Sequence, residues 1–117
     1  MLMGHLYYGS SESPIRMPDR ILAHVKVVVA TKLRRGESFT LSWRHPHDEE
    51  TGRSTIWIQP SIALRFVFST VEPEKIDGAL LQRYAAAANS SSGLIVDIEE
   101  ASPDATAAPA STASAVV

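Results

Sequence analysis

The side chains best suited to bind a ligand fall on one side of three strand-like segments in the middle of the chain. In the 54–59 segment Trp57 alternates with apolar neighbours, so Thr55 and Gln59 share its side. The same alternation places Arg44 and Arg65 on that side of the two adjoining segments. An indole can stack on a flat group and an arginine can hold a phosphate, so these five residues form the candidate binding surface.

Three interpretations of Trp57 are open at this point. Another element, such as the N-terminal hairpin, covers the ring. Alternatively the ring meets a second copy of the chain or a protein partner, since a tryptophan beside arginines is typical of protein interfaces. In the third interpretation it stacks on a nucleic acid whose phosphates Arg44 and Arg65 contact, although the net charge of −2 disfavours such a partner.

Residues 45–50, His-Pro-His-Asp-Glu-Glu, include side chains that can bind Zn or Ni. Pro46 stiffens the pair formed by His45 and His47, and no further ligand stands at a fixed spacing. A solvated hairpin loop explains this composition more simply, so we predict no metal site.

Lys75-Ile76-Asp77-Gly78 matches the lysine-x-aspartate-glycine signature of ATP-dependent DNA ligases and related nucleotidyltransferases. In those enzymes the lysine attacks the α-phosphate of ATP, which also requires metal-binding carboxylates and further nucleotide-clamping motifs. A tetrapeptide with one free position arises easily by chance, and a chain this small cannot supply the ligase nucleotide pocket. We interpret the match as coincidence and keep nucleotidyl transfer through Lys75 only as the remote alternative.

No other catalytic arrangement is legible. The sequence has no cysteine, no phosphate-binding glycine loop, and no serine, histidine and acid at a spacing that assigns roles. We therefore assign no catalytic residue and no cofactor, and favour a function other than catalysis.

Hydrophobic periodicity predicts two helices and six strands. Apolar residues with helical spacing run from Ile21 to Leu33, with His24 on the polar side, and the second helix lies between Pro73 and Asn89. Alternating or short apolar segments predict the strands. In chain order these are 5–8, 15–17, 38–44, 54–59, 64–69 and 94–97.

The resulting order, β-β-α-β-β-β-α-β, predicts the α+β class. Three consecutive hairpin-linked strands imply one antiparallel sheet of about five to six strands, with both helices packed on one face. The face toward the helices is expected to carry Phe39, Leu41, Trp43, Ile56, Ile58, Leu64, Phe66 and Phe68.

The composition is that of one small domain. Of 117 residues, 44% are hydrophobic and 21% charged, and no run of apolar residues is long enough to span a membrane. The N-terminus lacks a signal-peptide pattern, so we expect a cytoplasmic protein. Residues 101–117 contain only Ala, Ser, Thr, Pro, Val and one Asp, which predicts a disordered tail after a single domain at 1–100.

Several segments together resemble a small actinobacterial family of unknown function, whose members are often named ATP-dependent DNA ligase. These segments are 5–9, 19–24, 32–39, 41–43, 52–57, 88–90 and 93–94. The resemblance implies a stand-alone domain with no established catalytic residues. Members of that family mostly lack the tetrapeptide at 75–78, and their loop corresponding to 45–51 varies.

These observations favour a small binding or interaction module. It would self-associate through the outer face of the sheet, the side that carries the candidate binding surface. The alternative is a nucleic-acid accessory protein that uses Trp57 with Arg44 and Arg65. Neither interpretation involves a membrane.

Overall fold

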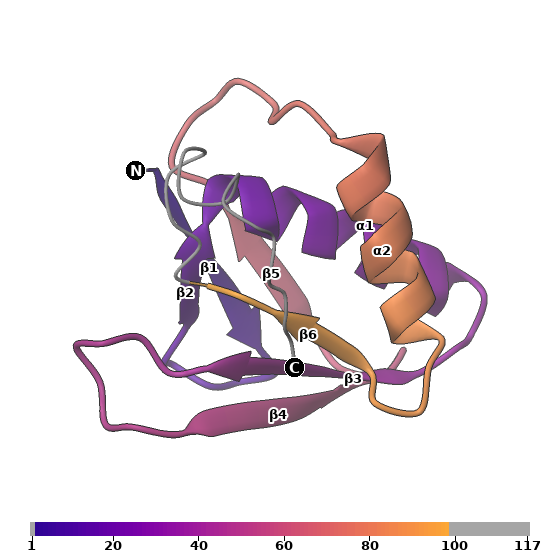
Figure 1. Ribbon diagram of the computed structural model, residues 1–117, viewed down its shortest axis with the longest axis horizontal. Coiled ribbons are helices and arrows are strands. Elements are labelled where there is room, and N and C mark those ends of the chain that lie inside the picture. The colour runs from indigo at the N-terminus through magenta and orange to yellow at the C-terminus, as the bar shows by residue number, and fades with distance from the viewer. Residues whose placement is uncertain (1, 99–117) are drawn as a thin grey trace.

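Two helices and two small sheets make up the part of the chain that the computed structural model describes, residues 2–98 (Figure 1). The element order confirms the predicted α+β class, and the predicted tail at 101–117 lies outside the described residues. In chain order the elements are β1 (Met3–Tyr8), β2 (Ile15–Pro18), α1 (Asp19–Arg34), β3 (Phe39–Arg44), β4 (Arg53–Ile58), β5 (Leu64–Val67), α2 (Gly78–Ala88) and β6 (Leu94–Val96).

The strands form two three-stranded sheets, so the prediction of one continuous antiparallel sheet is wrong. One sheet has the order β2-β1-β5 and the other β4-β3-β6. No hairpin joins β4 to β5, because β5 crosses to β1, where Leu64 lies opposite Tyr8. The Gly9 N–H donates to the Ala63 carbonyl at 2.8 Å and fixes this crossing. The last strand, β6, lies parallel to β3 rather than antiparallel.

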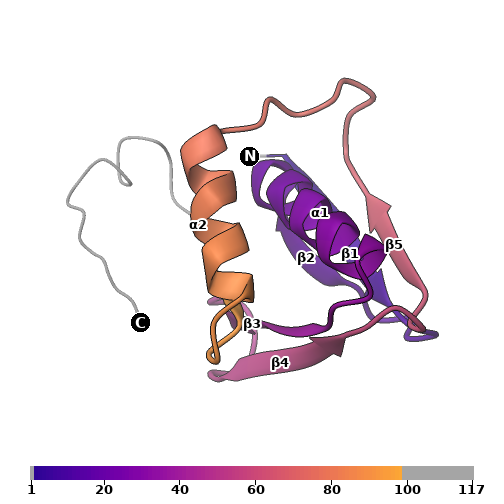
Figure 2. The same ribbon diagram turned by 90° about the vertical axis from the view of Figure 1, so that its right-hand side faces the viewer.

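Helix α1 runs through the centre of the molecule, beside the β2-β1-β5 sheet and next to α2 (Figure 2). Val28 and Val29 are each 3% exposed, although β-branched residues lose side-chain entropy in a helix. Burial of a valine contributes roughly 1.5–3 kcal/mol, which outweighs that propensity cost. The helix ends where the Glu37 N–H reaches back to the Lys32 carbonyl at 2.9 Å, around Gly36 with φ +73°.

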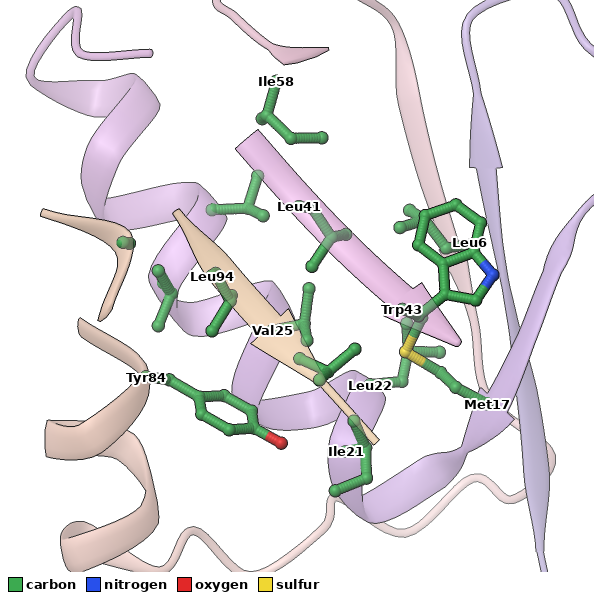
Figure 3. Close-up of a cluster of buried hydrophobic side chains, with 14 of the residues drawn as sticks. Leu6, Met17, Ile21, Leu22, Val25, Leu41, Trp43, Ile58, Tyr84 and Leu94 are labelled. Atoms are coloured by element: carbon green, nitrogen blue, oxygen red, sulfur yellow. The ribbon is translucent and has the colours of Figure 1, made fainter. Parts of the chain in front are cut away.

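The core is a single cluster to which every helix and most strands contribute (Figure 3). The predicted inner-face residues of β3 are all buried, and so is Ile58 of β4. Four predicted inner residues are only partly buried and pack at the margin of the cluster: Ile56, Leu64, Phe66 and Phe68.

His24 is fully buried, although the helical wheel places it opposite the apolar stripe. Its Nδ1–H donates to the Arg20 carbonyl at 2.7 Å, and its Nε2 accepts the Asp77 N–H at 2.8 Å. Helix α2 begins at Gly78 and not near Pro73 as predicted. The segment before it is therefore not helical, and it covers this face of α1 through the contact of Asp77 with His24. Ile76, which falls within the range predicted for the second helix, precedes that helix and is 40% exposed.

Neither helix of the described chain is long and apolar enough to cross a membrane.

Candidate functional site

The outer face of the β4-β3-β6 sheet, called the outer face below, turns away from both helices (Figures 1 and 2). Side chains alternate along each strand, and every second one points outward. On the other side of β3 from β4, Ile95 of β6 lies beside Ser42 of β3. The register arranges the outward side chains of β4 and β3 in three rows: Trp57 with Thr40, Thr55 with Ser42, and Arg53 with Arg44.

Trp57 is 54% exposed, so the N-terminal hairpin does not seal its ring. The other tryptophan, Trp43, lies on the inner side of the sheet near Met17 and is only 8% exposed (Figure 3). Ile95 is also 54% exposed, so the outer face carries two open apolar side chains at its two margins. Both side chains offer apolar contact area to a partner that covers this face.

The centre of the outer face is lined by hydroxyl groups. Ser42 Oγ and Thr55 Oγ1 lie 2.7 Å apart across β3 and β4, and either can donate. A hydroxyl both donates and accepts, so this row can satisfy an identical row on another molecule.

The structure separates the two arginines that the sequence places beside Trp57. Arg44 shares the outer face but lies at its far end, four residues along β3 from Thr40. That separation corresponds to about 13 Å along a strand. Arg65 lies on β5 in the other sheet, where its guanidinium sits over the Tyr7 ring at 5.7 Å from the centroid.

The other two predicted site residues differ in position. Thr55 stands in the middle of the outer face. Gln59 lies just beyond the end of β4, where its Oε1 accepts the Ser61 N–H at 3.1 Å and helps to turn the chain. Of the five predicted site residues, Trp57, Thr55 and Arg44 therefore lie on the outer face, with Arg44 far from Trp57, whereas Gln59 lies beyond the end of β4 and Arg65 lies on the other sheet.

Two residues of the outer face, Arg53 and Ile95, were not predicted from the sequence. Arg53 belongs to β4 and pairs with Arg44, and its alternation with Thr55 was the available signal. Ile95 lies in a three-residue strand that reads as a short apolar run. In so short a segment alternation cannot be told from uniform burial.

The outer edge of β4 is open, because β3 pairs with one side and no described strand pairs with the other. The His45 N–H donates to the Gly52 carbonyl at 2.8 Å just beyond the ladder. Since hydrogen-bonded and non-bonded pairs alternate in antiparallel strands, the three outer-face rows are the non-bonded pairs. The main-chain groups of Arg53, Thr55 and Trp57 therefore point away from β3, and the Tyr8 hydroxyl donates to the Trp57 carbonyl at 2.5 Å.

The histidine-rich loop between β3 and β4 is tied by local contacts. His45 Nδ1 donates to the Glu50 carbonyl at 2.9 Å, and its Nε2 lies 2.7 Å from Ser54 Oγ. Asp48 forms an ion pair with Arg16 at 3.1 Å. Within residues 2–98 no three His, Cys, Asp or Glu side chains are arranged to hold a metal ion.

The ligase-like tetrapeptide has a structural explanation. Asp77 Oδ1 accepts the N–H groups of Ala79 at 3.0 Å and Leu80 at 3.3 Å, so Asp77 is the N-cap of α2. Its Oδ2 pairs with Arg20 at 3.1 Å. Lys75 is exposed in the segment that precedes α2.

Two carboxyl groups have lowered pKa values. The Leu80 N–H, with smaller contributions from the Ala79 N–H and Arg20, holds the pKa of Asp77 below its ordinary value of 3.8. The Lys32 ammonium does the same for the pKa of Glu37, to which it lies at 3.1 Å. Lys32 also donates to Asn89 Oδ1 at 2.6 Å, which ties the C-terminal ends of the two helices together.

The lowered pKa of Asp77 predicts how Asp77→Asn behaves with pH. A depressed folded-state pKa stabilises the protein above the unfolded value of 3.8, and this contribution disappears as pH falls through the folded pKa. Urea unfolding should show the wild type more stable than the variant at neutral pH, with the difference shrinking as the pH falls below 3.8. A difference that stays constant or grows on acidification would contradict the assignment.

A family model described as Domain of unknown function (DUF7882) matches residues 3–99. No curated protein and no solved structure matches the chain. The match agrees with the resemblance to a small family of unknown function and does not address an actinobacterial origin or ligase names.

Proposed function

We propose that this chain, which belongs to the DUF7882 family of domains of unknown function, is a small cytoplasmic interaction module that self-associates through its outer face. The observation that carries the proposal is the exposure of Trp57, 54%, on a sheet face that also exposes Ile95. The absence of cysteine is consistent with a reducing compartment.

A second copy suits the outer face better than a nucleic acid does. Single-strand binding needs cations close to the stacking ring, whereas Arg44 lies at the far end of the face and Arg65 lies on the other sheet. The hydroxyl row of Ser42 and Thr55 is self-complementary, as a symmetric interface requires. The arrangement therefore favours a second copy of the chain over a polyanion.

Trp57→Ser tests this proposal. Because Trp57 faces solvent, the substitution should leave the fold intact, and the buried Trp43 reports on that fold by its fluorescence. Loss of an interface tryptophan costs about 2 kcal/mol or more, so we expect the dimer dissociation constant to rise about 30-fold. Light scattering after size exclusion measures the mass.

The matched control is Val71→Ser, which removes an apolar side chain that is 93% exposed in the segment between β5 and α2. This variant should retain the wild-type mass. Equal masses for wild type, Trp57→Ser and Val71→Ser at every concentration would refute self-association through the outer face.

A further inference from the structure

We infer that two copies join edge to edge, with β4 of one chain pairing antiparallel to β4 of the other around a two-fold axis at Thr55. The product is one continuous six-stranded sheet of order β6-β3-β4-β4-β3-β6. This inference rests on the proposed self-association and places the contact at the β4 margin of the outer face, around Thr55 and Trp57, with Ser42 and Ile95 outside it.

The backbone of β4 is prepared for such pairing. The N–H and C=O of Thr55 point away from β3, because Thr55 and Ser42 form a non-hydrogen-bonded pair. Two copies of Thr55 facing each other would exchange both of these bonds. An exposed row of unpaired main-chain groups is a template for a further strand.

β4 is also the best suited of the four sheet edges. It has six residues, whereas β2 and β5 have four and β6 has three. β2 contains Pro18, which cannot donate to a ladder. β4 has no proline and no lysine, the residues that commonly protect edges, and carries the β-branched Thr55, Ile56 and Ile58.

The side chains favour Thr55 as the centre of the pairing. Arg53 and Trp57 stand two residues to either side of it on the outer face. The two-fold axis therefore places Arg53 of each copy opposite Trp57 of the other, where a guanidinium can stack on an indole. A centre at Arg53 would instead bring two guanidinium groups together. In the register centred on Thr55, the Trp57 carbonyl accepts both from the Tyr8 hydroxyl and from the Arg53 N–H of the other copy, since a carbonyl oxygen has two lone pairs.

Cysteine cross-linking tests the pairing directly, because the natural chain has no cysteine. Facing residues of a hydrogen-bonded antiparallel pair have Cα atoms about 5.5 Å apart, within the range that a disulfide spans. Under mild oxidation Thr55→Cys should form a covalent dimer in most of the protein. Thr31→Cys, at an exposed position on α1, is the control and should stay monomeric on a non-reducing gel.

Thr55→Pro provides a second readout. The Thr55 N–H does not bond to β3, so the substitution leaves the intrachain ladder intact and should raise the dimer dissociation constant at least about ten-fold. A wild type that is dimeric, with no Thr55→Cys cross-link and an unchanged Thr55→Pro dimer, would overturn the edge pairing and leave the proposed self-association standing. A wild type that is monomeric throughout would overturn both.

Discussion

Gly93→Ala is expected to lower the free energy of unfolding by about 3 kcal/mol or more. Gly93 has φ +77°, a left-handed conformation that residues with a side chain adopt at a cost. A Cβ at this position would lie 1.9 Å from Thr40 Oγ1 and 2.8 Å from the Thr40 carbonyl oxygen. The close approach lets β6 lie directly beside β3, so the alanine must push apart the sheet that carries the outer face.

Gly36→Ala is the matched control for this prediction. Gly36 has a similar φ of +73°, but a Cβ there would meet nothing within 4 Å. Its replacement should therefore cost only the conformational term of about 1 kcal/mol. Urea unfolding of both variants separates the two contributions, and equal losses would show that the contact between Gly93 and Thr40 does not constrain the sheet.

Asp19→Ala is expected to cost about 3 kcal/mol of unfolding free energy. Asp19 is 1% exposed, and its Oδ2 accepts the Ser69 hydroxyl at 2.6 Å and the Ser69 N–H at 3.1 Å. Its carboxylate also lies in the first turn of α1, where the helix dipole favours negative charge. Alanine would leave two donors of Ser69 without their acceptor and detach the end of β5 from α1.

Ser69→Ala removes the hydroxyl and keeps the backbone bond, so it should cost only about 1 kcal/mol. In the double variant the hydroxyl is absent, so the combined loss should fall short of the sum of the two single losses. Chemical unfolding of the three variants measures this coupling. A loss for Asp19→Ala no larger than that for Ser69→Ala would contradict the role assigned to the carboxylate.

Local periodicity predicted the helices and strands of this fold, because the apolar residues within each element show which of its sides is buried. Period-two alternation placed Trp43 inside, and the structure leaves Trp57, its counterpart on β4, largely open. Strand pairing could not be predicted in this way, since alternation does not say which strand lies alongside. The crossing of β5 to β1 depends on contacts such as Gly9 with Ala63, which are 54 positions apart.

The errors at the candidate site also arise because local periodicity does not show which elements lie next to each other. Alternation along the 64–69 segment predicts that Arg65 lies on the same side of the sheet as Trp57. Its strand, β5, belongs to the other sheet, so Arg65 contacts Tyr7 and not Trp57. His24 has the helical phase of a surface residue and is buried because the segment before α2 covers it. The start of α2 had a local signal that the periodicity concealed, since Asp77 before Gly78 is a favourable N-cap.

Sedimentation velocity of the unmodified chain over a dilution series tests self-association through the outer face most directly. We expect the average mass to fall from twice 12.7 kDa to 12.7 kDa on dilution, and the same fall for Trp57→Ser to occur at concentrations about 30-fold higher. A wild-type chain that sediments at 12.7 kDa at every concentration up to about 1 mM would contradict it.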